Sequence, residues 1–194
     1  MLRIVTLNSW KCDGAYEARL DAMASGLAEL RADVICLQEC FATLPRAARE
    51  HGNDAILSSD TASTLAHRLD MDLYAAPARR KQRMHTNTAL LSTSGLAILT
   101  RLDAGETETL ALPTDSRDGE RIAQSLTLHD TEVGLRVVNT HLTHLRDAGS
   151  KRAAQIEAVL NRWCNTGTER VVIAGDLNAP LSAPEFGALR HRAG

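Results

Sequence analysis

Hydrophobic residues recur along parts of the chain at the three- and four-residue spacing of an amphipathic helix. In residues 15–31 this spacing is carried by Leu20, Met23, Leu27 and Leu30. From about Ser150 to Cys164 one helical face is formed by Ala154, Ile156, Val159, Leu160 and Trp163. We predict another helix over residues 41–51, and a further helix that ends near Leu69 and is capped by Ser58, Ser59 or Asp60.

Runs of apolar and β-branched residues predict many short strands between these helices. The most apolar runs are residues 4–7, 34–37, 135–138 and 171–174, and further β-like runs lie near residues 72–77, 86–92, 95–100, 106–111, 121–128 and 134–140. No Pro/Gly/Ser-rich linker, repeat or low-complexity segment interrupts the alternation. A chain of 194 residues that is 44% hydrophobic can bury one sizeable core. We therefore predict one α+β domain over residues 1–194, with helices outside packed sheets.

Each of the four most apolar runs leads into polar residues, namely Asn8, Gln38-Glu39, Asn139-Thr140-His141 and Gly175-Asp176-Leu177-Asn178. Taken alone, an Asp-x-Asn after a strand is more typical of a turn, because both side chains bond readily to their own backbone. If the four strands lie side by side, however, these polar side chains converge. Oxygen ligands with one imidazole suit Mg²⁺ or Mn²⁺ together with a phosphate oxygen.

The order of these residues resembles the endonuclease/exonuclease/phosphatase superfamily, and the run from Ser94 to Arg101 is similar to a strand typical of that family. The resemblance implies a four-layer αββα sandwich. It also implies Mg²⁺- or Mn²⁺-dependent hydrolysis of phosphate esters by a phosphodiesterase, nuclease or phosphatase, through in-line attack of an activated water. The substrate is then a small molecule, a lipid headgroup or a nucleic acid.

The family's closing Ser-Asp-His motif has no counterpart in this sequence, and His191 stands in a different context, between Arg190 and Arg192. We therefore expect a C-terminally short domain that lacks the last strand or strands of the family. An alternative hypothesis follows, in which the chain is a catalytically impaired member that binds a phosphorylated ligand or a partner chain. In that case an unpaired sheet edge can also associate with another copy.

The resemblance assigns a role to each polar strand end. Glu39 is implied as the main metal ligand; the alternative is an exposed carboxylate at the start of a helix over residues 41–51. Asn8 is implied to support the metal or its water; the alternative is a turn or capping amide. Asp176 is implied to orient or deprotonate the attacking water next to the metal. Asn178 then holds a phosphoryl oxygen, and His141 donates a hydrogen bond to the phosphate as charge builds on it.

Neighbouring polar residues are expected to support this site. Asn139 is predicted to contact substrate or to tie the loop together through its amide. Arg152 and Gln155 match the family's Arg-x-x-Gln, which bonds to substrate or to the sheet edge, although exposed polar residues would look the same. His144 lies three residues after His141, but the strand pattern before it argues against a shared helical face, so a rim or solvent position is expected.

The composition of the chain bears on the class of substrate. A net charge of −2 gives no overall attraction to polyanions, and 3% aromatic residues offer little surface for stacking single-stranded bases, which favours a small phosphate ester or a lipid headgroup. The basic run from Arg79 to His85 is expected to be a loop that either steers anions or is simply solvated. No Gly-x-Ser-x-Gly, phosphate-loop Gly-Lys or His-Glu-x-x-His motif is present.

The cysteines and the apolar runs bear on the compartment. The four cysteines form no Cys-x-x-Cys pair, so reduced thiols in the core are expected. No apolar stretch approaches the roughly 18 residues of a membrane span, and the N-terminus has no signal-peptide core. We therefore expect a cytoplasmic protein without a transmembrane segment.

Overall fold

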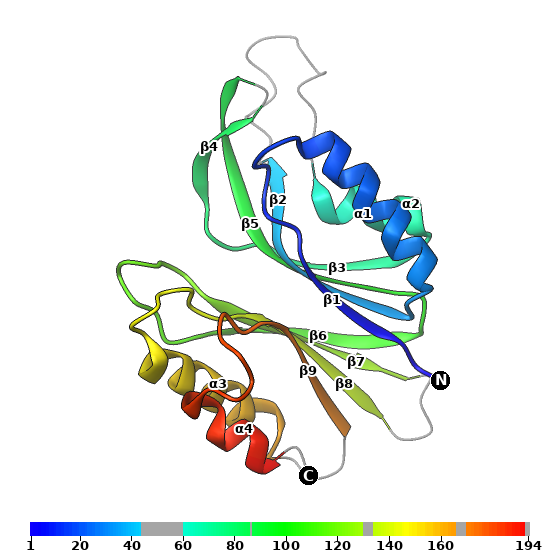
Figure 1. Ribbon diagram of the computed structural model, residues 1–194. Coiled ribbons are helices and arrows are strands. Elements are labelled where there is room, and N and C mark those ends of the chain that lie inside the picture. The colour runs from blue at the N-terminus through cyan, green and yellow to red at the C-terminus, as the bar shows by residue number, and fades with distance from the viewer. Residues whose placement is uncertain (44–59, 86, 130–133, 166–169, 193–194) are drawn as a thin grey trace. The chain divides into compact units, whose positions relative to one another are not determined.

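The computed structural model describes residues 1–43, 60–85, 87–129, 134–165 and 170–192. The chain divides into two compact units, Met1–Arg101 and Leu102–Gly194, and each unit has its own sheet and helices (Figure 1). None of the described helices is both long enough and apolar enough to span a bilayer.

The sheet of the first unit has the strand order β1-β2-β5-β3, and β4 also pairs with β5. Its strands are β1 Ile4–Asn8, β2 Val34–Thr43, β3 Asp72–Ala76, β4 Lys81–His85 and β5 Thr88–Thr100. Strands β1 and β2 are parallel and are joined by helix α1, Tyr16–Leu30, whereas β5 runs antiparallel to β2, β3 and β4. The carboxyl end of β1 therefore lies beside Gln38, in the middle of β2, and β2 continues to Thr43.

One apolar core holds α1 and the second helix, α2 Thr61–Leu69, against this sheet (Figure 1). Leu20 and Leu27 of α1 and Leu65 and Leu69 of α2 pack with the strand residues Ile35, Leu37 and Leu99. The predicted helix over residues 15–31 and the one ending at Leu69 are thus confirmed. Asp60 caps α2, since its side chain accepts a hydrogen bond from the backbone N–H of Ser63 at 3.0 Å. The other candidate caps, Ser58 and Ser59, lie outside the described residues.

Three predictions in this unit need correction. The predicted helix over residues 41–51 begins within β2, because residues 41–43 pair with β5, and the rest of that range lies outside the described residues. The expected strands 86–92 and 95–100 form one strand, β5, whose Ser92 and Ser94 hydroxyls both accept hydrogen bonds from Arg83 at 2.8 Å. Polar residues therefore continue this strand instead of breaking it.

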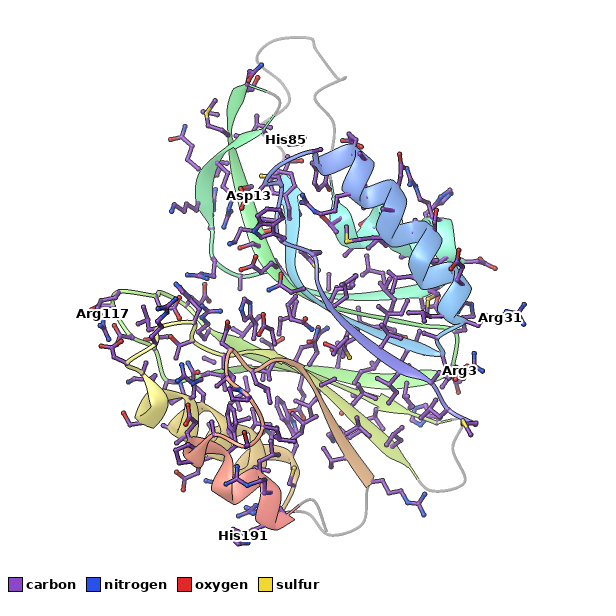
Figure 2. The ribbon with its side chains drawn as sticks, viewed as in Figure 1. Arg3, Asp13, Arg31, His85, Arg117 and His191 are labelled. Carbon is purple, nitrogen blue, oxygen red and sulfur yellow. The ribbon has the colours of Figure 1, made fainter. Side chains whose placement is uncertain are left out.

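The basic run from Arg79 to His85 is not a loop, because residues 81–85 form β4 along β5. His85 ends this strand and is buried against Tyr16 and Phe41, with ring centroids 5.2 and 5.1 Å apart (Figure 2). Because His85 is buried, only the rest of the basic run can face an anion.

The second unit has a sheet with the order β6-β7-β8-β9. Its strands are β6 Ala104–Ala111, β7 Ile122–Leu128, β8 Leu135–His141 and β9 Arg170–Asp176, followed by the short helices η1 Pro184–Phe186 and α4 Gly187–Arg192. Strand β7 is antiparallel to both β6 and β8, whereas β8 is parallel to β9. Helix α3, Gly149–Trp163, makes the crossover between β8 and β9 and confirms the helix predicted from about Ser150.

The core of this unit lies between α3 and one face of the sheet, where the helix residues Ile156, Val159, Leu160 and Trp163 pack with strand and loop residues such as Val138, Leu142 and Ile173. Because side chains alternate along a strand, Asn139, His141 and Asp176 project from the other face. His191, which sequence comparison with the family did not support as a site residue, is exposed on α4 (Figure 2).

Candidate active site

His141 and Asp176 end two adjacent parallel strands and are register partners. Their side chains leave the same face of the sheet, and the His141 Nε2 atom lies 3.8 Å from Asp176 Oδ2. The backbone ladder continues past them, since the N–H of Leu142 donates to the carbonyl oxygen of Asp176 at 2.9 Å. An imidazole and a carboxylate are therefore held side by side at the carboxyl ends of β8 and β9.

Gly175 makes this arrangement possible. Its φ is +141°, and a Cβ atom at this position would stand 2.0 Å from the backbone oxygen of Thr140 in β8. No real Cβ contact is that short, so only glycine allows β9 to approach β8 here and place Asp176 beside His141.

Asn178 closes the turn after β9. It adopts the left-handed conformation at φ +54°, its backbone N–H donates to Asp176 Oδ1 at 3.0 Å, and its side-chain Nδ2 donates to the carbonyl oxygen of Leu142 at 2.9 Å. The turn that Asp-x-Asn suggests on its own is present. It uses Oδ1 of Asp176, while Oδ2 faces His141, so the turn and the candidate site coexist.

Asn139 lies two residues before His141 on β8, is fully buried, and pairs in register with Gln124 of β7. It therefore shares the sheet face of His141 and lies deeper in the unit. Both the structural and the substrate-contact expectation for this amide stay predictions.

Arg152 and Gln155 of α3 are buried and bind the loop that follows β8. Arg152 donates from Nε to Glu185 Oε1 at 2.9 Å and from Nη1 to the carbonyl oxygens of Thr143 and Leu145. Gln155 accepts from the N–H of Thr143 and donates to the carbonyl oxygen of Pro113. These partners lie in η1 and in the loops after β6 and β8, so the contacts tie loops together and differ from the expected bonds to the sheet edge. We therefore interpret Arg152 as a residue that positions the loop, in place of a direct substrate contact.

In the first unit, Asn8 ends β1 and is the register partner of Gln38, which lies within β2. The expectation that Glu39 follows the last residue of its strand is wrong, because β2 continues to Thr43 along β5. Asn8 Oδ1 accepts from the N–H of Trp10 at 2.9 Å, so the turn suggested for this amide is present. The next residue, Glu39, lies in a β-bulge, because the pairing with β5 shifts between Leu37 and Cys40.

Glu39 has a left-handed backbone conformation, with φ +55°. A non-glycine residue in this conformation costs about 1–2 kcal/mol, and such strain often accompanies function. Its side chain is 13% exposed and belongs to β2, so the alternative of an exposed carboxylate at a helix start is wrong.

Lys11 is a residue that the sequence did not indicate. Its Nζ lies 3.0 Å from Glu39 Oε1, and its backbone N–H donates to the carbonyl oxygen of Glu39 at 3.1 Å. Trp10 and Lys11 both have positive φ, and Arg19 of α1 donates to their carbonyl oxygens at 3.2 and 2.9 Å. No pattern in the sequence signals this pairing, because it depends on two consecutive left-handed residues.

The structure thus places Asn8 and Glu39 on the neighbouring strands β1 and β2 of one unit, and brings His141, Asp176 and Asn178 together in the other. Among the described residues, no three or more His, Cys, Asp or Glu side chains gather closely enough to hold a metal ion. The convergence of Asn8, Glu39 and Asp176 on one ion stays a prediction. A carboxylate and an amide oxygen are nevertheless suitable ligands for Mg²⁺, which usually binds few protein groups and keeps several waters.

The sequence matches one family model, described as the Endonuclease/Exonuclease/phosphatase family, over residues 5–194. No curated protein matches the chain.

Solved structures share the fold at low sequence identity. An endonuclease/exonuclease/phosphatase family protein from Leptotrichia buccalis is 19% identical with a TM-score of 0.70, and the match covers 99% of this chain and 74% of that one. TDP2 from D. rerio, solved with a single-strand DNA product, is 19% identical with a TM-score of 0.62, over 100% of this chain and 65% of that one. The human Nocturnin catalytic domain, solved with a bound sulfate anion, is 17% identical with a TM-score of 0.65, over 95% and 67%. These matches confirm the predicted αββα fold class, with one mixed sheet and its helices in each unit.

Proposed function

Because the chain belongs to the endonuclease/exonuclease/phosphatase family, we propose that it hydrolyses phosphate esters in a reaction that depends on Mg²⁺ or Mn²⁺. The observation that carries the proposal is the pairing of His141 with Asp176, 3.8 Å apart at adjacent strand ends. Only a glycine at position 175 lets β9 approach β8 closely enough to bring the two together.

Glu39, Asn8 and Asp176 are the oxygen-bearing groups that would hold the ion or its water. Support for this assignment is that Asn8 and Glu39 lie on adjacent parallel strands of one sheet, with Glu39 at a bulge. When bound, the ion would neutralise charge on the non-bridging oxygens of the phosphate.

The remaining residues divide the reaction between them. Asp176 orients the attacking water and takes its proton as the new bond to phosphorus forms and the ester bond breaks. We assign His141 to donate a hydrogen bond from Nε2 to a phosphate oxygen, Asn178 to hold a phosphoryl oxygen, and Asn139 to contact the substrate.

The substrate class is narrowed by composition. Only 3% of residues are aromatic, which favours a small phosphodiester, a phosphomonoester or a lipid headgroup over a stacked single strand. The sulfate on the human neighbour and the DNA product on the D. rerio neighbour support a phosphate-like anion as the common element. The four free cysteines suit a reducing cytoplasm.

The ion pair between Lys11 and Glu39 favours a second candidate function. An ammonium 3.0 Å from the carboxylate already neutralises it, as expected of a family member that binds a phosphorylated ligand or a partner chain without hydrolysis. Strand β9 has only β8 as a neighbour among the described strands, so its other edge is the one we propose for pairing with another copy.

Hydrolysis of bis-p-nitrophenyl phosphate with Mg²⁺ or Mn²⁺ separates the two candidates. We expect turnover in the wild type, loss of it in Glu39→Ala and Asp176→Ala, and retention in Glu157→Ala, which removes an exposed carboxylate from α3. Metal binding without any turnover in the wild type would favour the binding function.

Calorimetric titration with Mn²⁺ tests the ligand assignment separately. Glu39→Gln should weaken the affinity more than Asp176→Asn, because the first removes the charge of the main ligand and the second mainly the orientation of water. The opposite order would overturn the assignment. Neither variant should lower the melting temperature strongly.

A further inference from the structure

The loop that follows β8 starts at the proposed site, and its backbone is held in place by hydrogen bonds to β9 and to helix α3. Its residue Leu142 donates to the carbonyl at the end of β9, and Thr143 donates its N–H to Gln155 at 3.0 Å. Arg152 donates to the two carbonyl oxygens that flank His144, at 3.3 and 2.8 Å. The backbone at His144 is therefore fixed, although the residue lies in a loop.

The imidazole of His144 is also fixed at one of its two nitrogens. Nδ1 lies 3.0 Å from Asp118 Oδ1 and 3.0 Å from Arg121 Nη2. Asp118 and Arg121 form a bidentate pair at 2.9 and 2.6 Å, and their side chains are 0% and 3% exposed. The His144 side chain is 58% exposed, so the ring is anchored through Nδ1 while Nε2 is the nitrogen available to a ligand.

A purely structural role does not explain this histidine. Burial by itself raises the pKa of Asp118, but hydrogen bonds from Nε and Nη2 of Arg121 and from Thr143, together with the charges of Arg121 and His144, outweigh it and hold this pKa well below its ordinary value. The Asp118 carboxylate therefore has stabilising partners besides His144. An orienting carboxylate behind a solvent-facing imidazole is the usual arrangement of a histidine that transfers protons.

The same guanidinium joins His144 to the proposed site. Arg121 Nη1 donates to the carbonyl oxygen of His141 at 3.4 Å, while Nη2 faces the His144 ring. His141 and His144 are thus held by one side chain. In the proposed reaction, Asp176 acts on the attacking water, and His141 and Asn178 act on the phosphate oxygens. None of these three residues protonates the leaving oxygen.

We propose that His144, oriented by Asp118, protonates the leaving oxygen of the phosphate ester; this inference rests on the proposed function. The Nε2 proton passes to the departing oxygen as the ester P–O bond breaks, while the bond from phosphorus to the water oxygen forms and Asp176 takes the water proton. His144 is left as neutral imidazole with Nδ1–H still donated to Asp118. The proton comes and goes at Nε2 without reorientation of the ring.

The test compares two substrates that differ in the basicity of the leaving group. Bis-p-nitrophenyl phosphate releases p-nitrophenolate, a weak base that needs little protonation. Diphenyl phosphate releases phenolate, which is a far stronger base. We expect His144→Gln to change kcat/KM only a few-fold on the first and to lower it roughly 100-fold or more on the second, within the usual range for a general acid. His191→Gln, an exposed histidine on α4, should leave both unchanged.

Asp118→Asn, as the positioning variant, should show the same dependence on the leaving group, with a smaller loss. Nitrogen NMR of the wild type should place the neutral ring's proton on Nδ1, and the Asp118→Asn variant should lose this preference. If His144→Gln lowers kcat/KM equally on both substrates, or does not lower it on diphenyl phosphate, the inference is overturned. The proposed hydrolase function is not affected by either result. Absence of metal-dependent turnover of both substrates by the wild type would remove the proposed function and this inference with it.

Discussion

Substitution of Gly175 by alanine should destabilise the second unit strongly. The added Cβ would lie 2.0 Å from the carbonyl oxygen of Thr140, and φ +141° is a conformation that alanine rarely adopts. Backbone strain of this kind costs about 1–3 kcal/mol, and overpacking adds about 1–3 kcal/mol more. Thr140 belongs to β8, which is paired on both sides by β7 and β9 and cannot retreat. We expect a loss of about 4 kcal/mol.

Urea unfolding followed by tryptophan fluorescence measures this loss. Trp163 is buried in the core of the second unit, whereas Trp10 in the first unit is already 56% exposed, so the change in emission on unfolding arises mainly from Trp163, in the unit that carries the substitution. A loss of about 4 kcal/mol corresponds to a fall of roughly 10 °C in melting temperature for a chain of this size. Hydrolysis should also fall at temperatures where the variant is folded, because a shifted β9 moves Asp176 away from His141.

Gly26→Ala is the matched control. Gly26 lies within α1, and a Cβ there meets nothing within 4 Å. Alanine is favoured over glycine in a helix by about 1 kcal/mol, so this variant should be more stable than the wild type. An unfolding free energy of Gly175→Ala within about 1 kcal/mol of the wild type would refute the reasoning, since that is less than the strain alone is expected to cost.

Further substitutions test other contacts. Lys11→Met should tighten Mn²⁺ binding in a calorimetric titration, because the ammonium 3.0 Å from Glu39 competes with the ion; weaker binding would show that Lys11 assists it. Asp118 has a pKa below its unfolded value of about 3.9, so the stability it contributes is present above that pH and is lost as pH falls toward the depressed value. Asp118→Asn should therefore lower stability at neutral pH and remove this part of the acid dependence in denaturation curves recorded from pH 6 to about pH 2. Asp60→Ala removes the cap on the N–H of Ser63 and should cost about 1 kcal/mol in thermal unfolding; no change would show that the cap contributes nothing.

The sequence predicted best where local pattern and tertiary packing agree. The helices near residues 15–31 and 150–164 follow from one apolar stripe each, and that stripe packs against a sheet. Prediction from the sequence failed where strand pairing overrode the local conformational preference of the residues. Residues 41–43 look helical but pair with β5, and the basic run at 81–85 looks like a loop but forms a hairpin with the same strand.

Polar side chains at strand ends were visible in the sequence because such side chains must be satisfied or functional, and Asn8, His141 and Asp176 do end their strands. Glu39 was expected there too, but it lies within β2 because the strand continues past the bulge. The order of these residues, through its resemblance to the endonuclease/exonuclease/phosphatase family, predicted a phosphate-ester site. Which groups face one another is not a local property. The pairing of His141 with Asp176 arises from the register of β8 and β9, and that of Lys11 with Glu39 from a bulge and two left-handed residues. Asp118 meets His144 across 26 residues because Arg121 bridges a loop and a strand end, and only the folded backbone brings such distant side chains within hydrogen-bonding distance.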